Sequence, residues 1–386
     1  MMTLQSSLNH SVARLADAFD LMNLYQKSAA ALDSDPLFLD IRKLQEALKN
    51  TGELWFLGHR GSELRCAMDI FIDYEQRIAR LGHIVISPDE ENIDETLKEI
   101  FKFSLDYLEH SLRTVDLLYT TTSTLTLKQQ ITLLDLNFKT LGIFPNFKGI
   151  DDTKLNGLTA YFFKNVLTLK RRDDFSLHPI LMPFYEIIKS ECALTPLPEA
   201  MLSNNSSIKE TISLPALELI QAPLFIGKRF QLLKQNQALG MNFYPFQTPD
   251  AVITDDVQNI EIFIKFQTSI RFAMIVGEHL RIRVDPTLLY TQVLKMLREK
   301  NISYVEIIND AADTVGNDCF YKAGFTPCGY FPALKLQGNQ RRDYVVFGRC
   351  SEYQMRPSLD LPSTYLAFFK QYYRLERRNF FPKTFE

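Results

Sequence analysis

Three side chains in the second half of the sequence could move protons: the phenol of Tyr321, the carboxylate of Glu278 and the imidazole of His279. Carboxylates and imidazoles can accept protons, and a positioned phenol can donate one, so these groups could support general acid–base catalysis. Glu306 in the run YVEIIND is a further candidate base. Each residue also has a structural interpretation. The Glu and His residues could be solvated residues at strand ends, and Tyr321 could be a core aromatic whose hydroxyl finds a hydrogen-bond partner.

The elements that would position these side chains alternate between strands and helices. The second half contains, in order, a helix in KRFQLLKQNQALG, strands in AVITDD, NIEIFIKFQ, RFAMIVG and HLRIRVD, a helix in PTLLYTQVLKMLREK, a strand in YVEIIND, a helix ending at FYKAGF, and a closing pair in TPCGYFPALKL and RRDYVVFGRC. Short β-branched or aromatic runs predict strands, and apolar residues three and four apart predict helices. We therefore expect mixed central sheets flanked by helices, an α/β fold.

The first half has a similar order of elements. Its first 50 residues are predicted to form two helices, with Leu15, Phe19, Met22 and Leu24 on one apolar face. The elements that follow are strands in GELWFLGHRG, SELRCAMDIFIDYE and RIARLGHIVIS, a helix in DETLKEIFKFSLDYLEHSL, a strand in VDLLYTTT, a helix in LKQQITLLDL, and a closing pair in KTLGIFPNF and LNGLTAYFFK.

The two halves also match residue by residue at one place. FKTLGIFPNFK, starting at Phe138, aligns without a gap with FTPCGYFPALK, starting at Phe325. The identical pairs are Phe138/Phe325, Gly142/Gly329, Phe144/Phe331, Pro145/Pro332 and Lys148/Lys335. Identity at the same place in the same order of elements indicates an internal duplication. The alternative is a coincidence of two Phe-Pro strand turns.

At FYKAGFTPCGYFP the sequence resembles the GNAT superfamily of acyl-CoA-dependent N-acyltransferases. In that family the last helix ends in a pattern similar to F-Y-x-K-x-G-F, and the next strand begins x-P-x-G. The resemblance covers roughly residues 12–164 and 216–350, and it implies two GNAT-like domains in tandem. Gly324 is then a helix C-cap, because glycine alone takes positive φ freely.

The resemblance implies roles for particular residues. An amine that attacks an acyl thioester loses a proton and the departing thiolate gains one. Tyr321 matches the family's frequent general acid, and Glu278 or His279 stands near the expected base on the fourth strand. The implied cofactor is acetyl-CoA or another acyl-CoA, and the acceptor is a small-molecule or peptide amine. The implied cofactor-binding residues are Arg281, Arg283, Thr287, Leu288 and Asn317.

Both halves depart from the family in the loop between the fourth strand and the next helix, where family members bind the cofactor pyrophosphate through glycines and an Arg or Gln. The first half reads SPDEENIDETLKEI, in which carboxylates between Asp89 and Glu95 would repel a pyrophosphate, and Ser87 reads as the cap of a capping box. Leu134 stands where the second half has Tyr321. The first domain is therefore predicted to be catalytically inactive. The second half reads VDPTLLYTQVLKML, with Thr287 as the expected N-cap, and its missing glycines leave room for an acyl carrier other than CoA.

Length and composition set the organisation. At roughly 100–200 residues per domain, 386 residues predict two or three domains. Residues 165–215 include the Pro-, Ser- and Asn-rich run PLPEAMLSNNSSIKE, which favours a connection containing one helix. The predicted boundaries are a degenerate N-terminal domain at 1–164, the linker at 165–215, a C-terminal domain at 216–350, and a basic, aromatic, helical tail at 351–386.

Other classes of protein are disfavoured. A formal net charge of −3 argues against nucleic-acid binding, and no apolar run reaches the length of a membrane span. The start lacks the layout of a signal peptide, and the five scattered cysteines favour a reducing, cytoplasmic compartment without a structural metal site. The tail aromatics are expected to pack between domains. Membrane or nucleic-acid contact is the alternative for its basic residues, Lys370, Arg374, Arg377 and Arg378.

These observations favour an acyltransferase with its active site in the C-terminal domain. The rival is a non-catalytic tandem scaffold or small-ligand binding module. The two differ in the cleft between the fourth and fifth strands of the second domain. Unoccupied backbone N–H groups at Pro286–Tyr290 favour the enzyme, whereas a cleft filled by Leu288 and Tyr290 favours the binding module.

Overall fold

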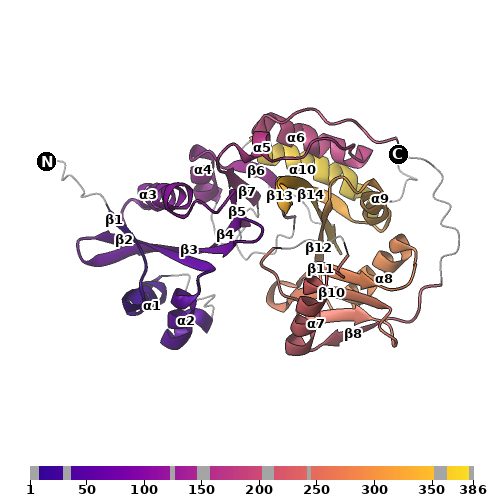
Figure 1. Ribbon diagram of the computed structural model, residues 1–386, viewed down its shortest axis with the longest axis horizontal. Coiled ribbons are helices and arrows are strands. Elements are labelled where there is room, and N and C mark those ends of the chain that lie inside the picture. The colour runs from indigo at the N-terminus through magenta and orange to yellow at the C-terminus, as the bar shows by residue number, and fades with distance from the viewer. Residues whose placement is uncertain are drawn as a thin grey trace. The chain divides into compact units, whose positions relative to one another are not determined.

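The computed structural model describes residues 8–28, 36–121, 127–145, 157–201, 213–240, 245–351 and 363–381 (Figure 1). Contacts between Cα atoms divide the chain into two compact units. The first unit comprises Met1–Lys139 and Thr153–Val166, and the second comprises Thr140–Asp152 and Leu167–Glu386. Each unit has a mixed sheet flanked by helices, which confirms the predicted α/β fold class.

The first unit contains strands in the order β1-β2-β3-β4-β5-β7, antiparallel except for the parallel pair β4/β5. The strands are β1 (Asn9–Val12), β2 (Glu53–Arg60), β3 (Glu63–Asp73), β4 (Ile78–Ile86), β5 (Leu117–Thr121) and β7 (Gly157–Phe162). The helices are α1 (Ala18–Lys27), α2 (Ile41–Lys49), α3 (Ile93–Asp106), which continues as a π-helical turn at Tyr107–Leu112, and α4 (Leu127–Asp135); short 3-10 turns lie at Leu15–Asp17 and Pro36–Leu39.

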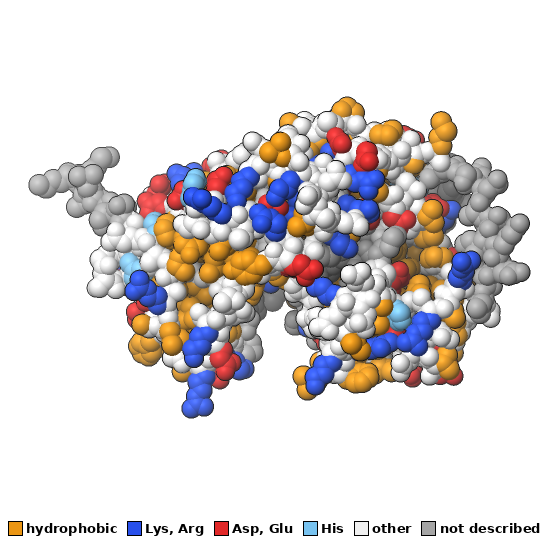
Figure 2. All heavy atoms as spheres, viewed as in Figure 1, with side chains coloured by type: hydrophobic (Ala, Val, Ile, Leu, Met, Phe, Trp, Pro, Cys, Tyr) orange, Lys and Arg blue, Asp and Glu red, His pale blue; other side chains and the backbone are white. Residues whose placement is uncertain are grey.

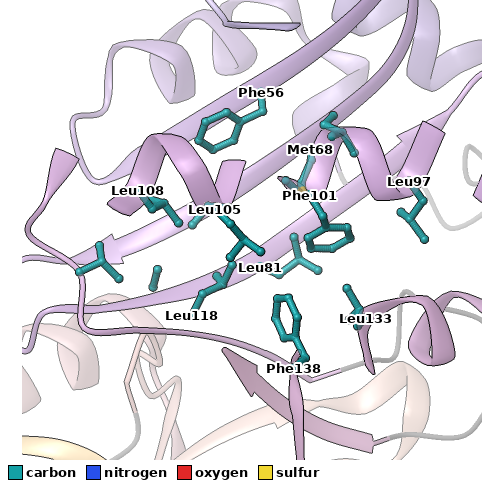
Figure 3. Packing of buried hydrophobic residues seen from close by; sticks show 14 of the residues in the cluster. Phe56, Met68, Leu81, Leu97, Phe101, Leu105, Leu108, Leu118, Leu133 and Phe138 are labelled. Carbon is teal, nitrogen blue, oxygen red and sulfur yellow. The ribbon is translucent and has the colours of Figure 1, made fainter. Parts of the chain in front are cut away.

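The core of the first unit follows from the spacing of apolar residues in α3. Leu97, Ile100, Phe101 and Leu105 recur at helical spacing, and all four are buried against strand residues such as Phe56 (Figure 3). A second apolar cluster joins α1 and α2 to the sheet. Layering helices on a sheet lets both kinds of element bury their apolar sides.

The N-terminal region differs from its prediction. Residues 9–12 form β1, which pairs with β2 at the sheet edge, so the first 50 residues are not wholly helical. The predicted apolar face of α1 is also misplaced, since Phe19 is 61% exposed and Leu21 is fully buried. The buried residues Ala18, Leu21 and Tyr25 are spaced three and four apart, and they define the face that packs inward.

The second unit contains strands in the order β6-β13-β14-β12-β11-β10-β9-β8, with β11 and β12 parallel and the other pairs antiparallel. The strands are β6 (Lys139–Ile143), β8 (Glu218–Gln221), β9 (Ala251–Thr254), β10 (Ile260–Gln267), β11 (Phe272–Leu280), β12 (Tyr304–Asp310), β13 (Thr326–Gln337) and β14 (Gln340–Cys350). The helices are α5 (Val166–Leu169), α6 (Met182–Cys192), α7 (Pro223–Gln235), α8 (Pro286–Glu299), α9 (Thr314–Lys322) and α10 (Ser363–Glu376), with 3-10 turns at Pro179–Leu181, Thr268–Ile270 and Arg377–Asn379.

The two runs RFAMIVG and HLRIRVD were predicted as separate strands, and this was wrong. They meet in one strand, β11, which ends at Leu280 and leaves Arg281–Val284 outside the sheet. The apparent break near Gly277 is an irregularity in the pairing with β10, where Val276 is the extra residue of a β-bulge. Gly277 also leaves room for a ring, because an added Cβ would lie 2.9 Å from Phe230 Cε2.

The predicted duplication is confirmed at the matched segments. Phe138 and Phe325 each stand immediately before a strand, β6 and β13, and each follows a helix. The backbone N–H of Phe138 donates to Leu133 O at 3.1 Å, and that of Phe325 donates to Phe320 O at 3.0 Å. The residues before them, Asn137 and Gly324, both have positive φ, which is the αL ending of a helix. Lys148 lies outside the described residues.

The structural units divide the chain differently from the predicted domains. Residues from Leu167 onward belong to the second unit, where α6 packs against β13 and α10. Arg171 is buried there, with its Nη2 atom 2.6 Å from Asp343 Oδ2. The predicted linker therefore contains a folded part of the second unit. The tail helix α10 also belongs to this unit and buries Tyr365, Phe368, Tyr372 and Tyr373.

Charged side chains of both signs are interspersed on the face shown in Figure 2. Among the described residues, no helix has both the length and the apolar character that a membrane crossing requires. The same part of the chain holds no group of three or more His, Cys, Asp or Glu side chains arranged to bind a metal ion.

Candidate functional site

The parallel pair β11/β12 opens at its carboxyl end. The two strands are paired from Phe272 with Tyr304 to Ile275 with Ile307. Beyond this point β11 continues beside β10 and β12 continues beside β14, without further pairing between them. The bulge at Val276 lies at the point of separation. A bulge bends a strand and increases its twist, so this feature helps the two strands to diverge.

Glu278 lies just beyond the opening, on β11. The Tyr290 hydroxyl, from α8, donates to Glu278 Oε2 at 2.5 Å. Burial raises the pKa of Glu278, the hydrogen bond from Tyr290 opposes that effect, and the negative charge of Asp313 adds to it. A raised pKa makes the carboxylate a stronger base, which suits an acceptor of protons near neutral pH.

His279 is held by neighbouring groups at both ring nitrogens. Nδ1 lies 2.7 Å from Ala238 O, so it carries the proton that is donated to this carbonyl. Nε2 accepts from Arg281 Nε at 3.2 Å. Arg281 is therefore directed toward His279, and Arg283 is exposed. Of the two predicted bases, only Glu278 contacts the Tyr290 hydroxyl.

The N-terminus of α8 is capped by Asp285. Its Oδ1 accepts from the backbone N–H of Thr287 at 2.8 Å and of Leu288 at 3.4 Å. The predicted N-cap, Thr287, was wrong by two positions, because Pro286 occupies the first helical position and the cap precedes it. The Asp285 carboxylate takes the N–H groups that a bound phosphate would need, and its charge opposes an anion. The Leu288 side chain is 58% exposed.

Asn317 is a buried residue near the start of α9. Its Nδ2 donates to Asp310 O and Ala311 O, both at 3.2 Å, and its Oδ1 accepts from Asn309 Nδ2 at 2.9 Å. These bonds satisfy both ends of the amide within the protein. They therefore fix the start of α9, close to its N-cap Asp313.

Tyr321 lies on a different side of α9 from the Glu278–Tyr290 pair. Its neighbour Phe320 packs edge-on against Tyr290, with ring centroids 4.8 Å apart. One residue along a helix turns the side chain by about 100°, so Tyr321 faces elsewhere. Its ring lies beneath Arg378, whose Cζ is 3.0 Å from the ring centroid. In the family pattern the tyrosine precedes the glycine by four residues, a position that Phe320 occupies here, since Tyr321 precedes Gly324 by three.

Glu306 lies in the paired part of β12, opposite Met274, before the strands separate. Burial raises its pKa well above the ordinary value. A carboxyl group within the paired sheet is poorly placed to meet a ligand in the opening. Glu306 is therefore better interpreted as a buried core residue.

The first unit contains a similar opening of a parallel strand pair. β4 and β5 are paired only from Ile78 to Arg80 on the β4 side, and the bulge of β4 follows. Within the acidic loop, Glu90 is buried, and Arg60 donates to both of its carboxylate oxygens at 3.1 Å. The predicted capping box at Ser87 was wrong, because α3 begins at Ile93 and Asn92 caps it.

Sequence reasoning missed Tyr290 as a partner of Glu278 and Asp285 as the cap of α8. Asp285 could have been found, since an Asp followed by Pro at the start of an apolar-periodic run indicates an N-cap and N1. Tyr290 carried no such signal. Its four-residue spacing from Pro286 places it one turn into α8, and only the tertiary fold brings it to Glu278.

No family model matches the chain, and no curated protein matches it. Among solved structures, it is similar to a probable acetyltransferase from Staphylococcus epidermidis, with 14% identity, 41% of this chain and 99% of that chain covered, and a TM-score of 0.34. A spermidine N-acetyltransferase from Vibrio cholerae, in complex with CoA and spermine, shows 16% identity, 40% and 95% coverage, and a TM-score of 0.34. The ribosomal-protein-S18-alanine N-acetyltransferase from Escherichia coli shows 16% identity, 41% and 94% coverage, and a TM-score of 0.33.

At this identity and TM-score, the likeness assigns neither an activity nor a substrate to this chain. The strand pairing within this chain defines its fold class. Each unit has an antiparallel meander, a bulged fourth strand and a parallel neighbour that separates from it. The two units therefore share one strand arrangement, in line with the tandem repeat predicted from the sequence.

Proposed function

We propose that the second unit transfers an acyl group from a thioester to a small-molecule or peptide amine, with Glu278 as the general base. The observation that carries the proposal is the position of Glu278, a carboxylate with a raised pKa placed just where β11 and β12 separate. An open strand pair gives an extended acyl carrier backbone groups to bind, and the base then lies beside it.

The proposed reaction is balanced within the site. The amine nitrogen forms a bond to the acyl carbon, and the carbon–sulfur bond breaks. The proton that the nitrogen loses passes to Glu278, and the leaving thiolate takes a proton from a general acid. Tyr321, the acid that the sequence predicts, lies on another side of α9 with its ring beneath Arg378. In the proposed reaction, Glu278 therefore serves as this acid and passes the proton received from the amine to the leaving thiolate.

The acyl donor is the less conventional part of the proposal. Acetyl-CoA or another acyl-CoA is the donor implied by the family resemblance, yet Asp285 occupies the N–H groups of Thr287 and Leu288. We propose that the donor's pantetheine arm, rather than a pyrophosphate at α8, provides most of its binding. Acyl groups carried on pantetheine without the nucleotide are then substrates of comparable quality.

A non-catalytic binding module is the second candidate. The observation that favours it is the burial of Tyr290, which is 2% exposed, together with the capped N-terminus of α8. The Tyr290 side chain fills space, and Asp285 takes N–H groups of α8. In the family that the sequence resembles, the cofactor uses these groups. Under this alternative, acyl thioesters bind weakly or not at all, and no thiol is released.

The experiment is a thiol-release assay on the full chain with acetyl-CoA, longer acyl-CoA and acyl-pantetheine, each with a panel of polyamines, amino acids and peptides. The proposal expects amine-dependent thiol release that is lost in Glu278→Gln. Thermal shifts with the same compounds separate binding from turnover, because a ligand that binds the native state raises its melting temperature. A shift without thiol release would support the binding module.

A further inference from the structure

A hydroxyl from α8 and a carboxylate from β11 form a short polar contact at the strand opening. Tyr290 donates to Glu278 Oε2 at 2.5 Å, and Tyr290 is buried whereas Glu278 is partly exposed. The bond ties one carboxylate oxygen to the protein. It therefore limits the rotation of the carboxylate and fixes how its other oxygen is presented.

The opposite side of the Glu278 side chain is also enclosed. Gly240, which follows α7, donates its backbone N–H to Glu278 O at 2.6 Å. A Cβ added to Gly240 would lie 2.5 Å from Glu278 Cγ and 2.8 Å from Glu278 Oε1. The Glu278 side chain is thus packed between a glycine that leaves it room and a tyrosine that bonds it.

The Tyr290 ring packs against two aromatic residues, Phe320 in α9 and Phe325 just after it. Its ring meets Phe320 edge-on at 4.8 Å and Phe325 edge-on at 6.4 Å between centroids. Edge-to-face packing of this kind defines ring orientation as well as burial. The run FYKAGF therefore supports Glu278 indirectly, through Phe320 and Phe325 rather than through Tyr321.

We propose that Tyr290 is the positioning residue of the general base: its hydroxyl holds Glu278 in the orientation and charge state that proton abstraction requires. This inference rests on the proposed function for its catalytic consequence. Its physical content, that Tyr290 stabilises the ionised form of Glu278, stands independently of turnover. A hydrogen bond donated to a carboxylate favours its charged form.

The decisive variant is Tyr290→Phe, which removes one oxygen and keeps the ring. Loss of the hydrogen bond raises the pKa of Glu278 further, because burial and Asp313 then act without opposition. The titration is followed by carbon NMR of labelled glutamate side chains, with Glu278→Gln used to assign the signal. The matched control is Tyr304→Phe, a buried tyrosine of the same unit whose hydroxyl lies 3.8 Å from Cys328 Sγ.

We expect an upward shift of the Glu278 titration in Tyr290→Phe and none in Tyr304→Phe. If the protein turns over an acyl donor, the inflection of kcat/KM against pH moves upward in parallel, and kcat falls roughly 10 to 10²-fold near neutral pH. An unchanged Glu278 titration in a folded Tyr290→Phe variant overturns the inference. A shifted titration without any turnover contradicts the proposed function and leaves the positioning role intact.

If Tyr290→Phe does not fold, Gly240→Ala provides the second test. The added methyl group displaces the Glu278 side chain from the other side while leaving the Tyr290 hydroxyl in place. We expect the Glu278 titration to change in this variant as well. An unchanged titration in Gly240→Ala contradicts the enclosed geometry on which the inference depends.

Discussion

Gly142 and Gly329 are direct Cα partners in the antiparallel pairing of β6 with β13. They are also the same position of the internal repeat, 187 residues apart. A Cβ added to Gly142 would lie 2.4 Å from Gly329 Cα and 2.7 Å from Cys328 O. Both copies of the repeat therefore have glycine at this position. At Gly142, the backbone of β13 leaves no room for a side chain.

Gly142→Ala should destabilise the protein. The added methyl group meets backbone rather than a flexible side chain, so the strands must shift, and overpacking of this kind costs about 1–3 kcal/mol of unfolding free energy. Urea denaturation measures the change. The control is Gly227→Ala in α7, where the nearest atom is Thr248 Cγ2 at 3.4 Å and alanine favours the helix. Equal stability of Gly142→Ala and wild type would contradict the close approach.

Much of the fold could be predicted from local patterns, because burial imposes its period on the sequence. The apolar stripe of α3 and the Phe-Pro match at Phe138 and Phe325 are examples. The strand β1 was missed, since four residues at a sheet edge carry too short a pattern to be distinguished from a loop. Its place is set by pairing with β2, which is a tertiary interaction.

Asp343→Ala should destabilise the second unit strongly. Asp343 is buried and accepts from Arg171 Nη2 and Tyr330 Oη, both at 2.6 Å, and from the backbone N–H of Ala333 at 2.9 Å. Removal of one partner leaves a buried guanidinium uncompensated, an effect of about 3–5 kcal/mol. Chemical denaturation is the measurement.

The matched control for Asp343 is Asp174→Ala, which removes the exposed partner of Arg172. We expect no resolvable change in stability from this variant, because solvent screens an exposed pair. If both variants lost the same small amount of stability, the buried pair would not anchor the segment around Arg171 to the second unit.

Glu306 should make stability depend on pH. Burial raises its pKa well above the value in the unfolded chain, so the folded protein retains a proton that the unfolded chain releases. The stability that this group contributes is fully present below the unfolded pKa and is lost as pH rises through the folded pKa. Glu306→Gln should therefore be more stable than wild type near pH 7, with a difference that shrinks toward pH 4.

Melting curves across this pH range measure the Glu306 effect. Glu299→Gln, at an exposed position of α8, is the control and should leave the pH dependence unchanged. A Glu306→Gln variant that follows the wild-type curve at every pH would show that the buried carboxyl is not held protonated.

The candidate site was harder to predict than the fold. Glu278 was identified because it stands at the start of the run HLRIRVD, near the place on the fourth strand where the family resemblance puts a base. The role of Tyr290 depends on how α8 rotates against β11, and no spacing in the sequence specifies that rotation. Tyr321 was predicted as the acid from a sequence motif. A shift of one residue along α9 moves a side chain to another face of the helix, and the motif does not reveal this shift.

Asp285→Asn should improve binding of CoA compounds. The amide keeps the capping oxygen but removes the negative charge from the N-terminus of α8, where the helix dipole favours anions. We expect a CoA dissociation constant lower by roughly two- to fivefold, from the 0.3–1 kcal/mol typical of a charge at a helix end. Calorimetric titration with CoA and with pantetheine measures it. An equal gain for pantetheine, which carries no pyrophosphate, would contradict the electrostatic explanation.

The most direct test of acyl transfer by the second unit is the pH dependence of amine-dependent thiol release, measured for wild type and Glu278→Gln with the best donor. A base must be ionised to act, so the wild-type rate should rise with pH through an inflection above the ordinary range of a glutamate, because burial raises the pKa of Glu278. Glu278→Gln should lose on the order of 10²-fold or more in kcat and show no such inflection. Equal rates and the same pH profile in both proteins would contradict the assignment of Glu278 as the base.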